Sequence, residues 1–332
     1  MRLVPSLRSR AIERAPRSWA IEHVPRTWAL WAAARPSQVL LILAVYALGV
    51  GAATAGPPVV TAVPPSAAIG PTVITTGSVT VGAVALVPVA TAIHYANEYV
   101  DADTDALADR TPFSGGSGAL SATGLPASFL GGATALATLV ALATLTGIVL
   151  REALPSASIA LLSVILVAGL TYSLPPLALI RRGVGEIVNA ALGGILLPLY
   201  GMSVLGAPTA TGVLVVLPFT LVVGCNLLAT HWADRRADAA VGKQTLAVRW
   251  SARGIRRTYA ILVVVAAALT AALWWAGAIP DAVAAAHLVA VPFLGWGWLT
   301  LARRESPFPP VVAMILLAVA STAAWWWVGI AA

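Results

Sequence analysis

Nine apolar stretches, each close to 20 residues long, constrain the fold of this chain more than any other feature of its sequence. A helix needs about 20 residues to cross about 30 Å of hydrocarbon. Hydrophobic residues make up 59% of the chain and charged residues only 10%, whereas a soluble domain carries about 25% charged residues. The sequence therefore predicts an all-α integral membrane protein with about nine transmembrane helices. The predicted helices cover residues 38–56, 72–96, 126–150, 156–174, 184–204, 208–230, 257–279, 281–301 and 309–331.

Lysine and arginine residues lie almost entirely on one side of these helices. Of the 20 basic residues, 19 fall before the first helix or in and beside the loops after helices 2, 4, 6 and 8, and only Arg151 lies opposite. Cytoplasmic loops of membrane proteins carry such an excess of basic residues. The pattern predicts a multi-pass protein of the cell membrane with a cytoplasmic N-terminus and an external C-terminus. It also accounts for the net charge of +7 without a nucleic-acid partner.

Residues 1–35 differ in composition from the rest of the chain. The segments PRSWAIE and PRTWALW form a short imperfect repeat of arginine and tryptophan. Such a composition is typical of a segment on the membrane surface, with indole rings at the headgroups and guanidinium groups near anionic lipid. A disordered tail is the alternative. We therefore divide the chain into an interfacial or disordered segment, residues 1–35, and a transmembrane domain, residues 36–332.

An acidic cluster follows the second apolar stretch, in the sequence NEYVDADTD. On a helix, Asn97, Asp101 and Asp105 share one face because they are spaced four residues apart. Ligands that are all oxygen atoms suit a hard divalent cation, and Mg²⁺ is typically held by one or two carboxylates together with substrate phosphates. The alternative is a solvated acidic loop, which describes Asp103 and Asp109 well. We predict that the first three residues hold Mg²⁺.

A second acidic pair lies just past the sixth apolar stretch, in NLLATHWADRRADAAVGKQTLAVRW. Asp234 and Asp238 are again four residues apart, and the distribution of basic residues puts them on the same cytoplasmic side as the first cluster. Two such clusters can face each other across a cavity and hold two Mg²⁺ ions with a diphosphate between them. We therefore predict an active site on the cytoplasmic side. Its predicted metal ligands are Asn97, Asp101, Asp105, Asp234 and Asp238.

Several motifs resemble those of the UbiA superfamily of intramembrane prenyltransferases. The first motif of that superfamily, N-D-x-x-D-x-x-x-D, is similar to residues 97–105, and its second, D-x-x-x-D, is similar to residues 234–238. The sequences RP at 35–36, YSLPPLALIRRGVGE at 172–186 and GKQTLAV at 242–248 resemble further features, the last two in the style of the naphthoate branch. The resemblance implies a nine-helix fold. It also implies Mg²⁺-dependent transfer of a polyprenyl group from its diphosphate to a membrane-associated acceptor, usually an aromatic ring.

Three positions depart from this resemblance. Glu98 stands where the first motif usually has aspartate, and it is a weaker candidate metal ligand than its neighbours. Pro176 stands where many members have lysine, and Ala233 stands where naphthoate-type members have arginine. These departures bear on the identity of the acceptor more than on the diphosphate chemistry.

Further residues are candidates for binding the diphosphate, because four aspartates and a diphosphate together carry more charge than two Mg²⁺ ions neutralise. Arginine forks and lysine ammonium groups suit phosphate, and backbone amides of a glycine-rich turn such as SGGSG at 114–118 can cradle it. A tyrosine ring can lie near the developing allylic cation or bond to phosphate. The predicted substrate-binding residues are Arg110, Ser114, Tyr172, Arg181, Arg182 and Lys243, and either arginine of the adjacent pair can serve.

The acceptor stays open on the sequence alone. The YSLPP and GKQTLAV segments favour a dihydroxynaphthoate and menaquinone biosynthesis, and the alternatives are a glycerol phosphate lipid, a hydroxybenzoate, a chlorophyllide or a carotenoid end group. An ion-coupled transporter or a scaffold without catalysis would be a different class of protein. Transporters place ionisable groups near the bilayer midplane, whereas these acids gather at one interface. Prenyl chain length and oligomeric state do not follow from the sequence.

Overall fold

The computed structural model of the chain describes residues 19–55, 59, 71–108, 110, 111, 113 and 115–331. Within these residues the chain forms helices and no strands, and nine helical segments are long and apolar enough to cross a membrane. The all-α fold class and the number of helices are therefore confirmed for the described residues. Residues 1–18 and Ser114 lie outside them, so the predictions made for the N-terminal segment and for Ser114 stay predictions.

The first half of the chain supplies four of these spans. Helices α2 (Pro25–Ala33) and α3 (Pro36–Thr54) together form the first span, and they meet at Arg35, whose backbone is left-handed with φ of 51°. Proline begins both helices, which suits this corner because the first amide of a helix has no partner within the helix. The next spans are α4 (Pro71–Val100), α7 (Ala127–Leu150) and α8 (Ser156–Ser173).

The second half supplies five spans. The first of them is irregular, because α9 (Gly185–Ala191), a π-helical segment (Leu192–Leu196) and α10 (Leu197–Ser203) follow one another without a break. Next come α11 (Ala210–Ala240) and α13 (Ala252–Trp275). The last two spans are α14 (Asp281–Ala286) with α15 (Val291–Thr300), joined by a 3-10 turn, and α16 (Phe308–Ala331).

The predicted bounds agree with most of these helices but are wrong at three ends, of which one is the start of the first span, at Pro25 and not at residue 38. Hydropathy ends the sixth helix at residue 230, but α11 runs on to Ala240. It starts the seventh at residue 257, but α13 begins at Ala252. Hydropathy marks where the hydrocarbon ends, and a helix can continue with polar residues into water beyond that point. The extension of α11 places both aspartates of the second motif on regular helix.

Close backbone contacts hold the central helices together. α3 packs most extensively on α16 and α10, α4 on α7, and α11 on α13. Where α3 crosses α10, a methyl group added to Gly49 would lie 1.9 Å from the carbonyl oxygen of Pro198. One added to Gly201 would lie 2.2 Å from the carbonyl oxygen of Tyr46. Helices in membranes commonly approach each other through such small residues. Lipid tails are as apolar as the side chains, so helix association depends on close packing rather than on the hydrophobic effect.

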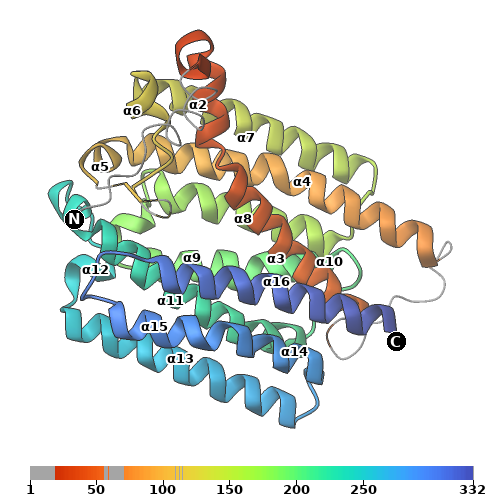
Figure 1. The fold of residues 1–332 in the computed structure, drawn as a ribbon. Coiled ribbons are helices and arrows are strands. Elements are labelled where there is room, and N and C mark those ends of the chain that lie inside the picture. Colours follow the sequence, from red (N-terminus) through yellow and green to blue (C-terminus); the bar gives the residue numbers. More distant parts are fainter. Residues whose placement is uncertain are drawn as a thin grey trace.

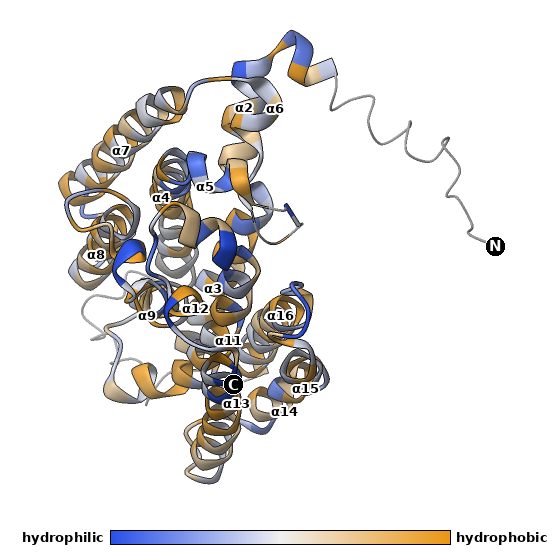
Figure 2. Cartoon of the chain, turned by 90° about the vertical axis from the view of Figure 1, so that its left-hand side faces the viewer, coloured by the Kyte–Doolittle hydropathy of each residue, from blue (hydrophilic) through white to orange (hydrophobic). Residues whose placement is uncertain are grey.

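The short helices between the spans gather at one end of the bundle. In Figure 1 α5 (Ala102–Leu107), α6 (Ala119–Thr123) and α12 (Leu246–Arg249) lie at the left, far from α14. Figure 2 looks onto this end and shows hydrophilic ribbon beside α5, with hydrophobic helices around it. The candidate site residues lie on or beside these short helices.

Candidate functional site

The first acidic motif spans a bend between α4 and α5. α4 ends at Val100, and Asp101 has φ of −90° and ψ of 4° before α5 begins. Helical spacing persists through the bend, because the Asp101 amide donates to the Asn97 carbonyl at 2.9 Å and the Asp105 amide to the Asp101 carbonyl at 2.8 Å. The Asn97 side chain also donates to Asp101 Oδ2 at 3.0 Å. The straight helix that the spacing predicts is therefore bent at Asp101, while the motif stays together.

The second acidic motif lies on continuous helix. Asp234 and Asp238 are one turn apart on α11. Beyond the helix, Gly242 has a left-handed backbone with φ of 74°, a conformation that glycine adopts without steric cost. The chain then turns back, and the amide of Lys243 donates to the carbonyl of Asp238 at 2.9 Å. This turn brings the lysine side chain next to the aspartates.

Lys243 joins the two acidic motifs. Its Nζ atom lies 2.8 Å from Asp101 Oδ1 and 3.3 Å from Asp238 Oδ1, and all three residues are buried. Burial opposes the charge of the lysine, but the carboxylates of Asp101 and Asp238 outweigh it and keep the pKa of Lys243 above its usual value. The fold thus brings the end of α4 and the end of α11 to one buried point.

The glycine-rich loop that follows α5 contacts both motifs. The amide of Gly115 donates to the carboxylate of Asp234. A methyl group added to Gly116 would lie 2.0 Å from Asp105 Oδ2, so the loop backbone passes directly over this carboxylate. The guanidinium of Arg110 donates to two carbonyl oxygens of the same loop, one of them at 3.3 Å. Arg110 therefore supports the loop, and within residues 19–55, 59, 71–108, 110, 111, 113 and 115–331 it forms no ion pair with a carboxylate.

We expect Gly116→Ala to lower turnover about 10-fold or more, equal to about 1.4 kcal/mol of transition-state stabilisation. The new methyl group has to displace the Asp105 carboxyl, and the φ of 68° already disfavours alanine. Gly124 is a matched control, because its φ is 67° but nothing lies within 4 Å of the position of an added Cβ. Gly124→Ala should lose similar thermal stability and keep turnover close to that of the wild type. Equal turnover of the two variants in liposomes would contradict a role for this contact.

Glu98 has partners other than the acidic motifs. Arg35 donates to Glu98 Oε1 through Nε at 2.8 Å and also through Nη2. The amide and the hydroxyl of Ser117 donate to Oε1 and Oε2 of Glu98, at 2.8 and 2.7 Å. Glu98 thus clamps the glycine-rich loop to the start of α3. Both of its oxygens are used in this way, which argues against the weaker assignment of Glu98 as a metal ligand.

Among the described residues, this region holds more carboxylates than cations that are paired with them. The five carboxylates are Glu98, Asp101, Asp105, Asp234 and Asp238, and the two paired cations are Arg35 and Lys243. Burial, together with the nearby carboxylates of Glu98 and Asp101, raises the pKa of Asp105 to about 7. An oxygen-only set of donors with surplus negative charge fits a hard divalent cation.

The side chains are not already gathered around one metal position. Across the described residues, no three His, Cys, Asp or Glu side chains form a group that could hold a metal ion. Lys243 Nζ lies between Asp101 and Asp238 and supplies positive charge there. A metal ion at this place therefore requires the lysine to move away from at least one of the two carboxylates.

The structure distinguishes the two adjacent arginines of the loop after α8. Arg181 donates to the carbonyl of Val241 at 3.2 Å, two residues before Lys243. Arg182 is exposed and donates to the carbonyl of Pro176, in its own loop, at 2.7 Å. Of the pair, only the first contacts the segment that carries the lysine, so we favour it as the phosphate-binding arginine.

Tyr172 lies in the last turn of α8 and is buried. Its hydroxyl is hydrogen-bonded to the side chain of Asn189 on α9, and the charges of Asp101 and Asp238 both reach it. The tyrosine therefore borders the cluster, as a residue in contact with the substrate would.

The sequence did not single out Arg35, Ser117 or Glu186 as parts of the site. Glu186 forms a buried hydrogen bond with His231, whose Nδ1 lies 2.9 Å from Glu186 Oε1. A signal for Glu186 existed, because an acidic residue inside an apolar stretch is commonly functional. Arg35 and Ser117 lie in the RP and SGGSG segments noted in the sequence, but they become partners of Glu98 only through the tertiary fold.

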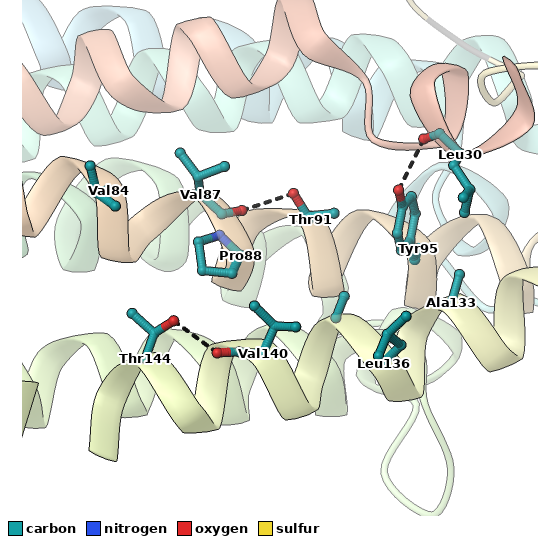
Figure 3. Close-up of a pocket in the computed structure, with 11 residues that line it drawn as sticks. Leu30, Val84, Val87, Pro88, Thr91, Tyr95, Ala133, Leu136, Val140 and Thr144 are labelled. Carbon is teal, nitrogen blue, oxygen red and sulfur yellow. Dashed lines mark hydrogen bonds between the residues drawn. The ribbon is translucent and has the colours of Figure 1, made fainter. Parts of the chain in front are cut away.

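An apolar groove lies on the other side of α4. Its volume is ≈ 620 Å³, and Figure 3 shows residues of α4 and α7 lining it, with the Tyr95 hydroxyl bonded to the carbonyl of Leu30. The lining positions of α4 run from Val84 to Tyr95, on the face roughly opposite Asn97. The groove is therefore separate from the acidic site.

Comparisons with known proteins agree with this arrangement. A family model described as the UbiA prenyltransferase family matches residues 55–314. The fold is similar to a solved UbiA homolog from Archaeoglobus fulgidus bound to GPP and Mg²⁺, with a TM-score of 0.59 and 16% identity over 90% of this chain and 99% of that chain. It is also similar to a structure described for digeranylgeranylglyceryl phosphate synthase, with a TM-score of 0.60 and 11% identity over 92% and 99% of the two chains. No curated protein matches the sequence.

Proposed function

This chain belongs to the UbiA prenyltransferase family, and we propose that it transfers a polyprenyl group from its diphosphate to an aromatic quinone precursor, with Mg²⁺ bound between its two acidic motifs. The observation that carries the proposal is the contact of Lys243 Nζ with Asp101 and Asp238. A cation that already touches both motifs marks the place where positive charge is needed, between two elements that the fold brings together. A transporter does not explain why this charge lies at one end of the bundle.

The proposed metal ligands are those expected from the sequence: Asn97, Asp101, Asp105, Asp234 and Asp238. The oxygen donors and the surplus negative charge support them, and one solved relative of the same fold holds GPP and Mg²⁺. When bound, Mg²⁺ supplies Lewis-acid stabilisation of the charge on a departing diphosphate.

The protein's own cations then orient the diphosphate. Lys243 is close enough to both motifs to transfer its contacts from carboxylate to phosphate oxygens, and Arg181 lies beside the same segment. The loop that Glu98 clamps covers the carboxylates and helps to exclude water from the reacting carbon. Exclusion of water matters because water would compete with the acceptor for the allylic cation.

An assay of acceptors tests the proposed reaction. Membranes that contain the chain are incubated with labelled geranylgeranyl diphosphate and 1,4-dihydroxy-2-naphthoate, 4-hydroxybenzoate or geranylgeranylglycerol phosphate in turn. The YSLPP and GKQTLAV segments favour product from the naphthoate, which would place the chain in menaquinone biosynthesis. Product from the glycerol phosphate alone would overturn the aromatic acceptor and keep the prenyl transfer.

We expect exhaustive chelation with EDTA to abolish turnover and added Mg²⁺ to restore it. The reason is that the carboxylates alone repel the diphosphate, whereas a bound divalent cation attracts it. Initial rates of labelled product formation measure the effect, with a Mg²⁺ titration after chelation. Full turnover in EDTA would contradict the metal requirement.

We further propose a cytoplasmic N-terminus, a cytoplasmic active site and an external C-terminus. Among the described basic residues, only Arg151 follows the end of a helix on the side away from the carboxylates, and basic residues favour the cytoplasmic side. A reporter fused after residue 332 should be active outside the membrane, and one fused before residue 1 should be active in the cytoplasm. A C-terminal reporter that is active only in the cytoplasm would contradict this orientation.

A further inference from the structure

A second polar cluster lies beside the acidic site, inside the membrane-spanning part of the chain. Glu186 is on α9 at the start of a span, and only 4% of its surface is exposed. Its Oε1 atom accepts two hydrogen bonds, from His231 Nδ1 at 2.9 Å and from the amide of Leu246 at 2.6 Å. Because a carboxylate only accepts, the histidine carries its proton on Nδ1 in this pair.

The other carboxylate oxygen has no donor. Glu186 Oε2 is buried and accepts no hydrogen bond of ordinary geometry within the described part of the chain, although the amide of Glu186 itself also acts on this carboxylate. A buried polar atom without a partner is costly, and a carboxylate oxygen more so than a neutral one. Such an atom beside a substrate site indicates a donor that arrives with a ligand.

The cluster adjoins the diphosphate site from the membrane side. His231 is three residues before Asp234 on α11, so the two share a helix face, with the histidine one turn deeper in the bundle. The end of α8 contacts both regions: a methyl group added to Gly185, next to Glu186, would lie 3.4 Å from the Tyr172 ring, and the Asn97 side chain donates to the hydroxyl of Ser173 at 3.4 Å. A molecule that reacts at the prenyl carbon beneath the diphosphate would meet these side chains.

We propose that Glu186 Oε2 accepts a hydrogen bond from a hydroxyl group of the prenyl acceptor, so that Glu186 and His231 form the acceptor-recognition site. This inference rests on the proposed function, because it assigns the acceptor side of the same reaction. The negative charge of Glu186 selects a hydroxyl and repels a carboxylate, so an acceptor that carries both groups would turn its hydroxyl edge toward α9. His231 and the Leu246 amide hold the carboxylate in place by occupying Oε1.

The Glu186→Gln substitution distinguishes recognition of the acceptor from a merely structural role of Glu186. The glutamine carbonyl can replace Oε1 as acceptor for both existing donors, which leaves its NH₂ group, a donor, where Oε2 stood. A hydroxyl of the acceptor then loses the charged oxygen to which it donates and can only accept from the NH₂ group, which a methyl ether at the same position does equally well. We therefore follow the ratio of kcat/KM for 1,4-dihydroxy-2-naphthoate to that for each of its mono-O-methyl ethers, with geranylgeranyl diphosphate as donor.

In the wild type, one of the two ethers should be about 10-fold or more worse than the parent compound, as expected for a hydrogen bond to a charged group. In Glu186→Gln this ratio should fall to about 1, with an acceptor KM about 10-fold higher and an unchanged KM for the diphosphate. Glu305→Gln is the control, because Glu305 is an exposed carboxylate paired with Arg235 and Arg236. It should keep the wild-type ratio.

Four outcomes decide the matter. If the wild type uses both ethers with the same kcat/KM as the parent compound, the proposal is overturned without any variant. A Glu186→Gln protein that keeps the wild-type ratio also overturns it. Product from another hydroxylated acceptor, and none from the naphthoate, overturns the choice of the naphthoate alone. The same comparison with that acceptor and its O-methyl ether then decides the role of Glu186. A lack of product from every hydroxylated acceptor overturns both proposals.

Discussion

Asp101→Asn and Asp234→Asn should each lower turnover by about 100-fold or more, equal to about 2.7 kcal/mol of transition-state stabilisation. Asparagine keeps the shape of the side chain and one acceptor oxygen, so the bond from Gly115 to residue 234 can persist. It loses the charge that holds Mg²⁺ against the diphosphate. Steady-state rates at saturating Mg²⁺, with purified protein in liposomes, measure the loss.

The double variant should be less than additively worse, because both residues act on one bound diphosphate. Asp103→Asn is the matched control, because Asp103 lies in α5, directly after Asp101, but is exposed. Turnover of this variant should stay within a few-fold of that of the wild type. Near-wild-type rates for Asp234→Asn would contradict the assignment of two cooperating motifs. An inactive Asp103→Asn protein that accumulates normally would contradict the assignment of the metal ligands to the helix face of Asp101 and Asp105.

Lys243→Met should lower the thermal stability of the metal-free protein strongly and also remove most turnover. The substitution leaves the carboxylates of Asp101 and Asp238 buried without their cation, which costs about 3–5 kcal/mol when one partner of a buried pair is removed. Mg²⁺ supplies the missing charge, so it should raise the melting temperature of the variant more than that of the wild type. Turnover should stay low at saturating Mg²⁺, because the diphosphate lacks its lysine contact.

The control for this experiment is Arg236→Met, which removes an ion pair from the surface. The Arg236 side chain is 78% exposed and pairs with Glu305 at 3.2 Å, and such surface pairs contribute about 0–1 kcal/mol. Its melting temperature and its response to Mg²⁺ should match those of the wild type. If Lys243→Met also behaves like the wild type in both measurements, the lysine does not bridge the two motifs in solution.

The membrane fold can be predicted from the sequence because each span depends only on the residues of its own apolar stretch. A span needs about 20 apolar residues whatever surrounds it, so nine stretches predict nine helices. The same holds for pairs of residues four apart, which meet on one helix face. Asp234 and Asp238 were found in this way, although the point at which α11 ends was not, because polar helix and polar loop have similar hydropathy.

Contacts between distant segments depended on the tertiary structure. The chain itself does not reveal that Lys243 lies between Asp101 and Asp238, or that Glu98 binds Arg35 and Ser117. Each of these side chains can pair with several partners of opposite charge, and only helix packing selects one.

The sequence by itself determined the class of membrane protein, the two acidic motifs and the oxygen chemistry of their ligands, because each depends on residue type and short spacing. Only the tertiary structure decided which arginine faces the lysine segment and which carboxylate oxygen is left without a donor. Both of these depend on where α9 and the loop after α8 lie against α11 and the chain that follows it. That placement is set by helix packing over the whole bundle rather than by any local pattern of residues.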